Sequence, residues 1–314
     1  MSGRLPDFLI IGAAKSGTTT LYRDLDQHPC VFFPVHKEPH CLQDDRVFSE
    51  SGRKQYEHLF DDAGDAVRLG EASTGYAKRP RIDGVAERAK RLLGDELRVF
   101  YIVRNPIQRA LSHHLHYVSD ARLPALFDDA LDADVNIAGD LISIGRYWMQ
   151  IEPWLEALGE DRVMPIVFEE YLDDRATMGP ACWRFLGLDA AETAFDASAM
   201  HNTRDQRRSA RGLVRMLTWS SAYRLRFRKY VPEGVVEWGK RWLMSPSVSD
   251  VPKPGVDALR RVADAVRDDV EAFSKWMGRD RPIWDVDATV RRLVEEPLEA
   301  TEADAESVEG SRAG

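Results

Sequence analysis

The chain of 314 residues is 44% hydrophobic, which is enough to bury the core of one large α/β domain or of two small ones. Its formal net charge of −9 comes mostly from residues 295–314, so the remainder lacks the basic balance of a nucleic-acid-binding protein. Three widely spaced cysteines argue against a disulfide framework or a zinc site, and no apolar run is long enough for a membrane span or a secretory signal. Together these features predict a cytoplasmic protein.

The start of the chain combines an apolar run, a turn of small residues and a helical pattern. Residues 8–11 predict a short buried strand, and residues 12–17 predict a turn that begins and ends with glycine. Residues 18–27 predict a helix with Leu21 and Leu25 on one face. The N–H groups of the first turn of such a helix, with the positive end of its dipole, bind anions. We therefore expect a phosphate-binding loop here.

This loop differs from the mononucleotide P-loop, Gly-x4-Gly-Lys-Ser/Thr, in the position of its lysine. Gly12 and Gly17 have the required spacing, but Thr18 stands where the lysine would be, and Lys15 lies inside the turn. A lysine in this place suits a loop around a terminal phosphate, whose charge it would neutralise without a bound magnesium ion. A glycine turn with a solvated lysine is the alternative.

The segment Lys-Ser-Gly-Thr-Thr-Thr-Leu resembles the 5′-phosphosulfate loop of sulfotransferases that use 3′-phosphoadenosine 5′-phosphosulfate (PAPS), above all of the carbohydrate branch with its heparan sulfate sulfotransferases and bacterial members. The resemblance implies a P-loop-like three-layer α/β fold with a central parallel sheet flanked by helices. It implies PAPS as the donor, adenosine 3′,5′-bisphosphate as the product, and no metal. The residues then expected to bind the donor here are Lys15, Ser16, Gly17, Thr18, Thr19 and Thr20.

The next predicted strand, residues 31–33, leads into a proline-bracketed loop that resembles the segment carrying the general base of carbohydrate sulfotransferases. The resemblance implies that Glu38 is this base. It matches His40 to the family's histidine, as a structural neighbour or as a catalytic group, and Lys37 is expected near the acceptor. Attack of a hydroxyl on sulfur requires removal of its proton, which a carboxylate can perform. An ordinary surface charge is the alternative for Glu38.

A later segment, Gly-Glu-Ala-Ser-Thr-Gly-Tyr, resembles a family segment at the end of the third strand. Glu71 and Ser73 within it are expected to shape the acceptor site, with a structural role as the alternative. Animal members often carry a catalytic lysine where Ala72 stands. That role is therefore unfilled in this chain, or it is taken by Lys37 or Lys78.

The most apolar strand pattern, residues 97–103, is expected at the centre of a parallel sheet. It ends at Arg104, after which Asn105 and Pro106 predict the N-cap and first turn of a helix. The family binds the donor's 3′-phosphate with an arginine at this strand end and a serine eight residues later, here Arg104 and Ser112. A guanidinium group suits a phosphate dianion. A strand-end salt bridge is the alternative for Arg104.

Three histidines follow in the same predicted helix, His113, His114 and His116. Positions 113 and 114 point to different faces, and no carboxylate stands at ligand spacing, so we expect no metal site. Residues 145–158 resemble a Gly-x-Tyr helix beside the cleft of the family, which makes Arg146 and Tyr147 candidates for acceptor binding.

The family also has a late basic loop that closes over the 3′-phosphate, and Arg207, Arg208 and Ser209 are the positions expected to form it. Residues 213–245 mix aromatic and basic side chains and predict packed helices. The same pattern would suit a lid over the acceptor, or a peripheral membrane surface for a lipid-linked acceptor. A last amphipathic helix is predicted over residues 256–277.

We therefore predict one sulfotransferase domain, residues 1–294, followed by an acidic disordered tail, residues 295–314. Its partner would be a small-molecule or carbohydrate acceptor, and no nucleic acid. Two alternatives stay open. A P-loop kinase would act on ATP with magnesium, but no strand-end aspartate supports it. A non-catalytic nucleotide-binding module would lack a use for Glu38.

Overall fold

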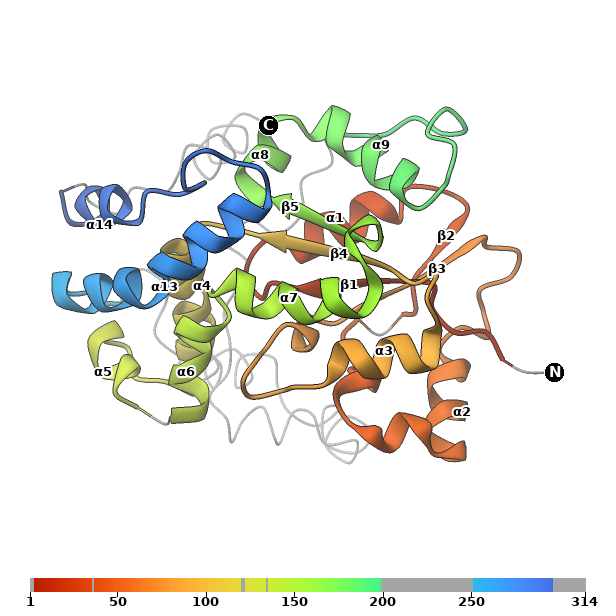
Figure 1. The fold of residues 1–314 in the computed structure, drawn as a ribbon, viewed down its shortest axis with the longest axis horizontal. Helices are drawn as coiled ribbons and strands as arrows, with labels where there is room; N and C mark the ends of the chain where they lie inside the picture. Colours follow the sequence, from red (N-terminus) through yellow and green to blue (C-terminus); the bar gives the residue numbers. More distant parts are fainter. Residues whose placement is uncertain (1–2, 36, 120–121, 134, 199–250, 296–314) are drawn as a thin grey trace, which may run out of the picture.

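The computed structural model describes residues 3–35, 37–119, 122–133, 135–198 and 251–295. Five parallel strands form one sheet in the order β2-β3-β1-β4-β5, and helices cover both of its faces (Figure 1). The strands are β1 (Phe8–Gly12), β2 (Val31–Phe32), β3 (Arg68–Ala72), β4 (Arg98–Val103) and β5 (Val163–Val167). This architecture confirms the predicted α/β fold. The most apolar strand, β4, is interior as expected, although β1 is the middle strand.

Helices in the described ranges connect the strands and complete the two outer layers. They are α1 (Thr18–Leu25), α2 (Glu50–His58), α3 (Val85–Leu93), α4 (Pro106–Ser119), α5 (Phe127–Leu131), α6 (Val135–Ser143), α7 (Tyr147–Leu158), α8 (Phe168–Asp173), α9 (Arg175–Phe185), α13 (Val256–Trp276) and α14 (Val286–Glu295). Parallel strands need such crossovers, which explains why helical and strand patterns alternate along the chain.

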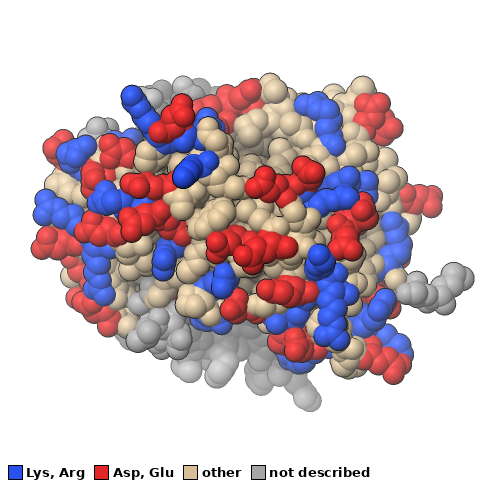
Figure 2. Space-filling view, viewed as in Figure 1, with Lys and Arg blue, Asp and Glu red and all other residues tan. Residues whose placement is uncertain are grey.

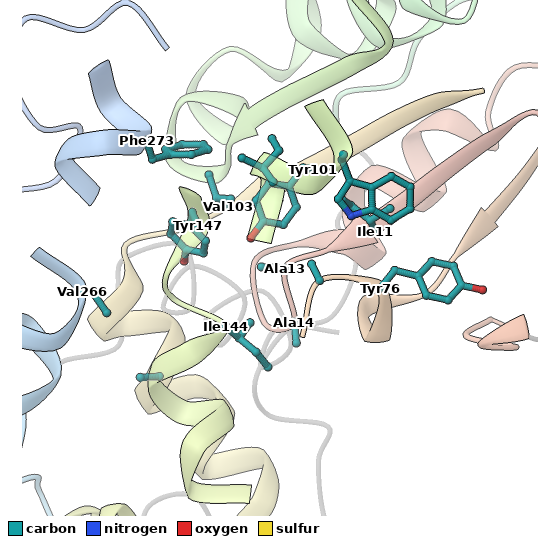
Figure 3. Close-up of a cluster of buried hydrophobic side chains, with 14 of the residues drawn as sticks. Ile11, Ala13, Ala14, Tyr76, Tyr101, Val103, Ile144, Tyr147, Val266 and Phe273 are labelled. Atoms are coloured by element: carbon teal, nitrogen blue, oxygen red, sulfur yellow. The ribbon is translucent and has the colours of Figure 1, made fainter. Parts of the chain in front are cut away.

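The sheet separates two hydrophobic clusters because successive side chains of a strand point to opposite faces. On one face, Leu9 and Val99 pack with α3, α4, α7 and α13. On the other face, Phe8 and Phe100 pack with α1 and α9. Figure 3 shows part of the first cluster, where Tyr147 lies close to the chain that follows β1. Both faces are buried, so the strands read as nearly continuous apolar runs.

Local sequence signals account for several helix ends. The Asn105 side chain accepts the N–H groups of Ile107 and Gln108 at 3.1 and 3.2 Å, which confirms the predicted N-cap of α4. The helices predicted over residues 145–158 and 256–277 are present as α7 and α13. Helix α14 was not predicted, although its buried Val286 and Val290 have the spacing of an apolar helix face.

Some sequence predictions lie outside the described residues. They are the basic loop with Arg207, Arg208 and Ser209, the aromatic and basic segment 213–245, and the tail from residue 296 onward. None of the helices within the described ranges is both long enough and apolar enough to cross a membrane. On the face seen in Figure 2, acidic and basic side chains are interspersed rather than gathered into a basic patch.

Candidate active site

The predicted site residues follow the carboxyl ends of the parallel strands, where open α/β sheets bind their ligands. The sheet thereby gathers segments that are far apart in the sequence. The loop with Lys15 follows β1, the loop with Lys37 and Glu38 follows β2, Ser73 and Thr74 follow β3, Arg104 follows β4, and Phe168 follows β5. Because β1 is the middle strand, its loop lies between the segments that follow β3 and β4.

The loop after β1 has the backbone of an anion-binding turn. Lys15 and Gly17 adopt left-handed φ angles of 69° and 88°, and Gly17 is the N-cap of α1. In the described structure no side chain caps α1, and its first turn contains no acidic residue. The N–H groups of Thr18 and Thr19 have no partner inside the helix by its geometry. This helix end therefore offers N–H donors and a positive dipole to an anion.

One aromatic ring connects this loop with Arg104. A Cβ atom on Gly17 would come within 2.3 Å of two Phe168 ring atoms, so the glycine lies flat against the ring. The Arg104 guanidinium carbon lies 5.5 Å from the centre of the same ring. The anion-binding turn and the strand-end arginine are therefore separated by about one phenyl ring, a distance that one nucleotide can bridge.

Arg104 and Ser112 share a strand–helix unit but are not in direct contact with each other. Arg104 donates to the Gln108 side chain at 3.4 Å, one turn into α4. Ser112 is half-buried a further turn along. A ligand that contacts both would therefore lie along the first two turns of α4.

Two residues expected at the acceptor occupy other places. Tyr147 is fully buried, its hydroxyl donates to the Arg104 carbonyl oxygen, and burial raises its pKa to about 12. It therefore lies behind the strand end, where it holds Arg104 rather than facing an acceptor. Arg146 is exposed just before α7, and its positive charge acts on Asp269 of α13. The helix is as predicted, but its first residues face the packed layer, because α7 lies against α13.

The loop after β2 presents Glu38 to solvent in a constrained backbone. Glu38 and His40 have φ angles of 62° and 58°, a conformation that costs a non-glycine residue about 1–2 kcal/mol. The Glu38 carboxylate accepts the Thr74 hydroxyl at 3.1 Å and lies 3.5 Å from His40 Nε2. Its side chain keeps 35% exposure, so an acceptor can reach it. Strained residues of this kind cluster at functional sites.

Two lysines, Lys37 and Lys78, interact electrostatically with Glu38. Lys37 Nζ donates to the Thr19 hydroxyl at 2.9 Å, which joins the loop after β2 to α1 and places Lys37 on the phosphate side. Burial lowers the pKa of Lys37 and that of Lys78, while the nearby Glu38 opposes both shifts. Burial also lowers the pKa of His40, again opposed by Glu38, so this imidazole is neutral near pH 7.

Glu71 and Ser73 lie beneath the site instead of in it. Both side chains are fully buried, and Ser73 donates to Glu71 at 2.6 Å. Tyr56 and Tyr76 donate to the same carboxylate, with a Tyr76 distance of 2.5 Å. Burial raises the pKa of Glu71, and the three hydroxyl donors oppose that shift. A buried carboxylate with this many donors was not visible in the sequence, because its tyrosines come from α2 and from the turn after β3.

The histidines of α4 take part in packing. Arg109 donates to His113 at 3.1 Å, the His113 ring stacks on Tyr117, and His114 lies 2.8 Å from the Pro124 carbonyl oxygen. The rings of His113 and His114 therefore each contact a neighbouring group inside the packed layer.

One group of three potential metal ligands occurs in the described part of the chain, formed by His28, Cys30 and Glu192. His28 Nδ1 accepts the Cys30 N–H at 3.2 Å, so the ring proton is on Nε2, which donates to the Asp189 carbonyl at 3.2 Å. Nε2 is also the atom that faces Glu192, at 3.9 Å. The ring is therefore oriented for hydrogen bonding and not for ligating a metal.

A parallel sheet with a glycine turn and a helix N-terminus after its middle strand, and an arginine after the adjacent strand, defines a P-loop-like α/β fold. Residues 5–234 match the family model described as the sulfotransferase domain. This match covers most of the chain, and the chain belongs to the sulfotransferase family.

Individual proteins that resemble this chain are sulfotransferases as well. The chain is 28% identical over 195 residues to human (Homo sapiens) heparan sulfate glucosamine 3-O-sulfotransferase 6, which covers 60% of this chain and 54% of that protein. It is 27% identical over 194 residues to mouse (Mus musculus) heparan sulfate glucosamine 3-O-sulfotransferase 3A1, which covers 60% and 47%. The chain thus spans about half the length of these curated relatives. A crystal structure of a sulfotransferase from Alicyclobacillus acidocaldarius shares the fold, with a TM-score of 0.60, 21% identity, and coverage of 92% of this chain and 100% of that one.

Proposed function

We propose that this chain transfers a sulfuryl group from PAPS to a hydroxyl group of an acceptor. The proposal depends above all on one observation, the contact of both Gly17 and Arg104 with the Phe168 ring. PAPS carries phosphate groups at both its 5′ and 3′ positions, so it needs two anion-binding sites. The turn with Gly17 and the Arg104 guanidinium, on the same phenyl ring, would provide them. Membership in the sulfotransferase family supports the same donor.

The donor would be bound mainly by groups that the sheet fixes in place. Lys15, with the N–H groups of Thr18 and Thr19 and with Ser16, Gly17 and Thr20 of the same turn, binds the 5′-phosphosulfate. Arg104 and Ser112 bind the 3′-phosphate, and the guanidinium fork matches its oxygens. Lys37, which already contacts Thr19, adds a second positive charge on the sulfuryl side. These donors stabilise the negative charge that develops as the sulfuryl group leaves the phosphate.

Glu38 would act as the general base. Its carboxylate takes the proton of the acceptor hydroxyl while the hydroxyl oxygen forms a bond to sulfur and the bond from sulfur to the bridging phosphate oxygen breaks. The products are a sulfate ester and adenosine 3′,5′-bisphosphate. Thr74 and the neutral His40 orient the carboxylate from two sides.

A carbohydrate hydroxyl is the proposed acceptor. The names of two relatives refer to a glucosamine 3-O position, and the likeness of each to this chain extends over 60% of it. Lys78, which is half-buried and interacts electrostatically with Glu38, is the lysine proposed to contact a polar acceptor.

The test uses purified protein and PAPS labelled in the sulfuryl group, incubated with a desalted cell extract and with heparan-type and simple amino sugars. The expected result is a labelled product that forms without added magnesium and requires Glu38. Label that stays in PAPS with every acceptor, together with magnesium-dependent phosphate transfer from ATP, would support a kinase instead.

A further inference from the structure

A buried carboxylate lies directly beneath the loop that carries Glu38. Glu71, near the end of β3, is fully buried and accepts hydrogen bonds from the hydroxyls of Tyr56, Ser73 and Tyr76. The mechanism above gives Glu71 no direct part, because its side chain cannot reach an acceptor. Burial of a carboxylate is costly unless its oxygens are satisfied, so three convergent donors indicate a specific task.

Two of the three hydroxyls also bind the backbone of the Glu38 loop. The N–H group of His40 donates to Ser73 Oγ at 3.2 Å, and the N–H group of Leu42 donates to the Tyr76 hydroxyl at 3.0 Å. The loop is further held where the Glu38 N–H donates to the Ala72 carbonyl at 3.0 Å. These bonds recur at every second residue of the loop and include the N–H groups of both left-handed residues, Glu38 and His40.

The direction of these hydrogen bonds is fixed by the number of protons. A hydroxyl has one proton to donate, and a backbone N–H can only donate. Since Ser73 and Tyr76 accept from the loop, each must give its own proton to Glu71. An ionised carboxylate can accept both protons, whereas an amide or a protonated acid at position 71 would present a donor and turn one hydroxyl around.

The loop is also seated closely on the turn that contains these hydroxyls. A Cβ atom on Gly75 would lie 2.8 Å from His40 Nδ1 and 2.1 Å from Gln43 Nε2. The side chains of His40 and Gln43 therefore pack directly on the Gly75 backbone, which seats the loop against the turn that carries Ser73 and Tyr76.

We propose that Glu71 is a positioning residue that, through Ser73 and Tyr76, locks the backbone of residues 38–42 in the conformation that presents the general base. The effect of Glu71 on sulfuryl transfer rests on the proposed function. The hydrogen bonding that holds the loop does not depend on it. Tyr56 provides a matched control, because it donates to the same carboxylate and is equally buried, but among the described hydrogen bonds it accepts none from the backbone of the loop.

The test is amide hydrogen exchange across residues 38–43 in the full chain. Tyr76→Phe and Ser73→Ala each remove a hydroxyl that accepts a loop N–H, and exchange there should accelerate by about 10-fold or more. Tyr56→Phe should leave exchange in this segment within about 2-fold of wild type, even if it lowers the free energy of unfolding. Equal acceleration in both tyrosine variants, or no acceleration in Tyr76→Phe, would overturn the proposal.

A second readout separates positioning from catalysis. Adenosine 3′,5′-bisphosphate should bind Tyr76→Phe and Tyr56→Phe with the affinity of wild type, because the phosphate loop is untouched. Sulfuryl transfer should fall by roughly 10-fold or more in Tyr76→Phe only. If the wild-type chain shows no transfer at all, the proposed function fails, and the exchange result still decides whether the hydroxyls of Ser73 and Tyr76, which donate to Glu71, hold the loop.

Discussion

The two halves of the candidate site are built in different ways. The donor half, formed by the turn after β1, Arg104 and Phe168, consists of backbone N–H groups and a strand-end side chain fixed by the middle of the sheet. The base half, formed by the loop after β2, is held by side-chain hydroxyls that converge on Glu71. Anion binding needs a rigid array of dipoles, whereas proton removal needs one carboxylate held at the correct angle. In the proposed function, one edge of the sheet would therefore carry a donor site held by the backbone and a base held by side chains.

The largest expected effect is that of Glu38, the proposed general base, because its substitution should impair transfer and leave nucleotide binding intact. Glu38→Gln keeps the shape of the side chain but removes the proton acceptor, so transfer should fall by about 10³-fold. The affinity for adenosine 3′,5′-bisphosphate should not change, and calorimetry beside a labelled-PAPS assay measures both. The exposed Glu87→Gln is the control. Transfer at the wild-type rate in Glu38→Gln would remove Glu38 from its role.

Substitution of Arg104 should have the opposite effect, because it should weaken nucleotide binding. Arg104→Ala should weaken binding of adenosine 3′,5′-bisphosphate by about 10–100-fold, because a charge-assisted bidentate contact is lost. Binding of AMP, which lacks the 3′-phosphate, should be unaffected. Arg260→Ala, at an exposed position of α13, controls for loss of charge. A similar loss for AMP would mean that Arg104 only supports the fold.

Substitution of two glycines tests the close contact between the turn after β1 and the Phe168 ring. Gly17 and Gly84 are the N-caps of α1 and α3 and share a left-handed backbone, with φ and ψ of 88° and 15° at Gly17 and of 70° and 15° at Gly84. A Cβ on Gly17 would come within 2.3 Å of the Phe168 ring, whereas a Cβ on Gly84 would meet the end of the Arg88 side chain at 3.0 Å. Gly84→Ala should lower the free energy of unfolding by about 1 kcal/mol from backbone strain. Gly17→Ala should cost about 1–3 kcal/mol more because of overpacking. Urea unfolding measures both, and equal values would contradict the close contact between this turn and Phe168.

The smallest expected effect is a pH dependence of stability. Burial, together with the positive charges of Arg109, Lys78 and Lys15, lowers the pKa of His113, so the unfolded chain binds more protons below about pH 6.5. Stability should therefore fall as the pH drops from 7.5 to 5.5. His113→Gln should remove about 1 kcal/mol of this drop.

The exposed His58→Gln is the matched control for this change, measured by urea unfolding at both pH values. A drop that is the same in wild type and in His113→Gln would show that this imidazole is not the group that titrates.

The donor half could be predicted from the sequence because its parts are local. Strand, glycine turn and helix are consecutive at residues 8–25, and Arg104, Asn105 and Pro106 directly follow an apolar strand. Periodicity and capping rules are sufficient for such units. The parallel sheet followed from the same alternation of strands and helices.

The contacts that support each half could not be predicted, because they join segments far apart in the chain. In the base half Tyr56 reaches Glu71 from α2, and in the donor half Phe168 reaches Gly17 from the end of β5. Tyr147 illustrates the same limit, since its helix was predicted correctly but its hydroxyl points at Arg104. A single sequence specifies which faces are apolar, but it does not specify which buried hydroxyl meets which carboxylate.

The central claim is that one nucleotide spans from the turn after β1 to Arg104. Calorimetric titration of the wild-type chain with adenosine 3′,5′-bisphosphate, AMP and ATP tests it most directly. The account predicts that adenosine 3′,5′-bisphosphate binds at least about 100-fold more tightly than the other two, since only it presents a 3′-phosphate. Equal affinity for all three nucleotides would contradict it.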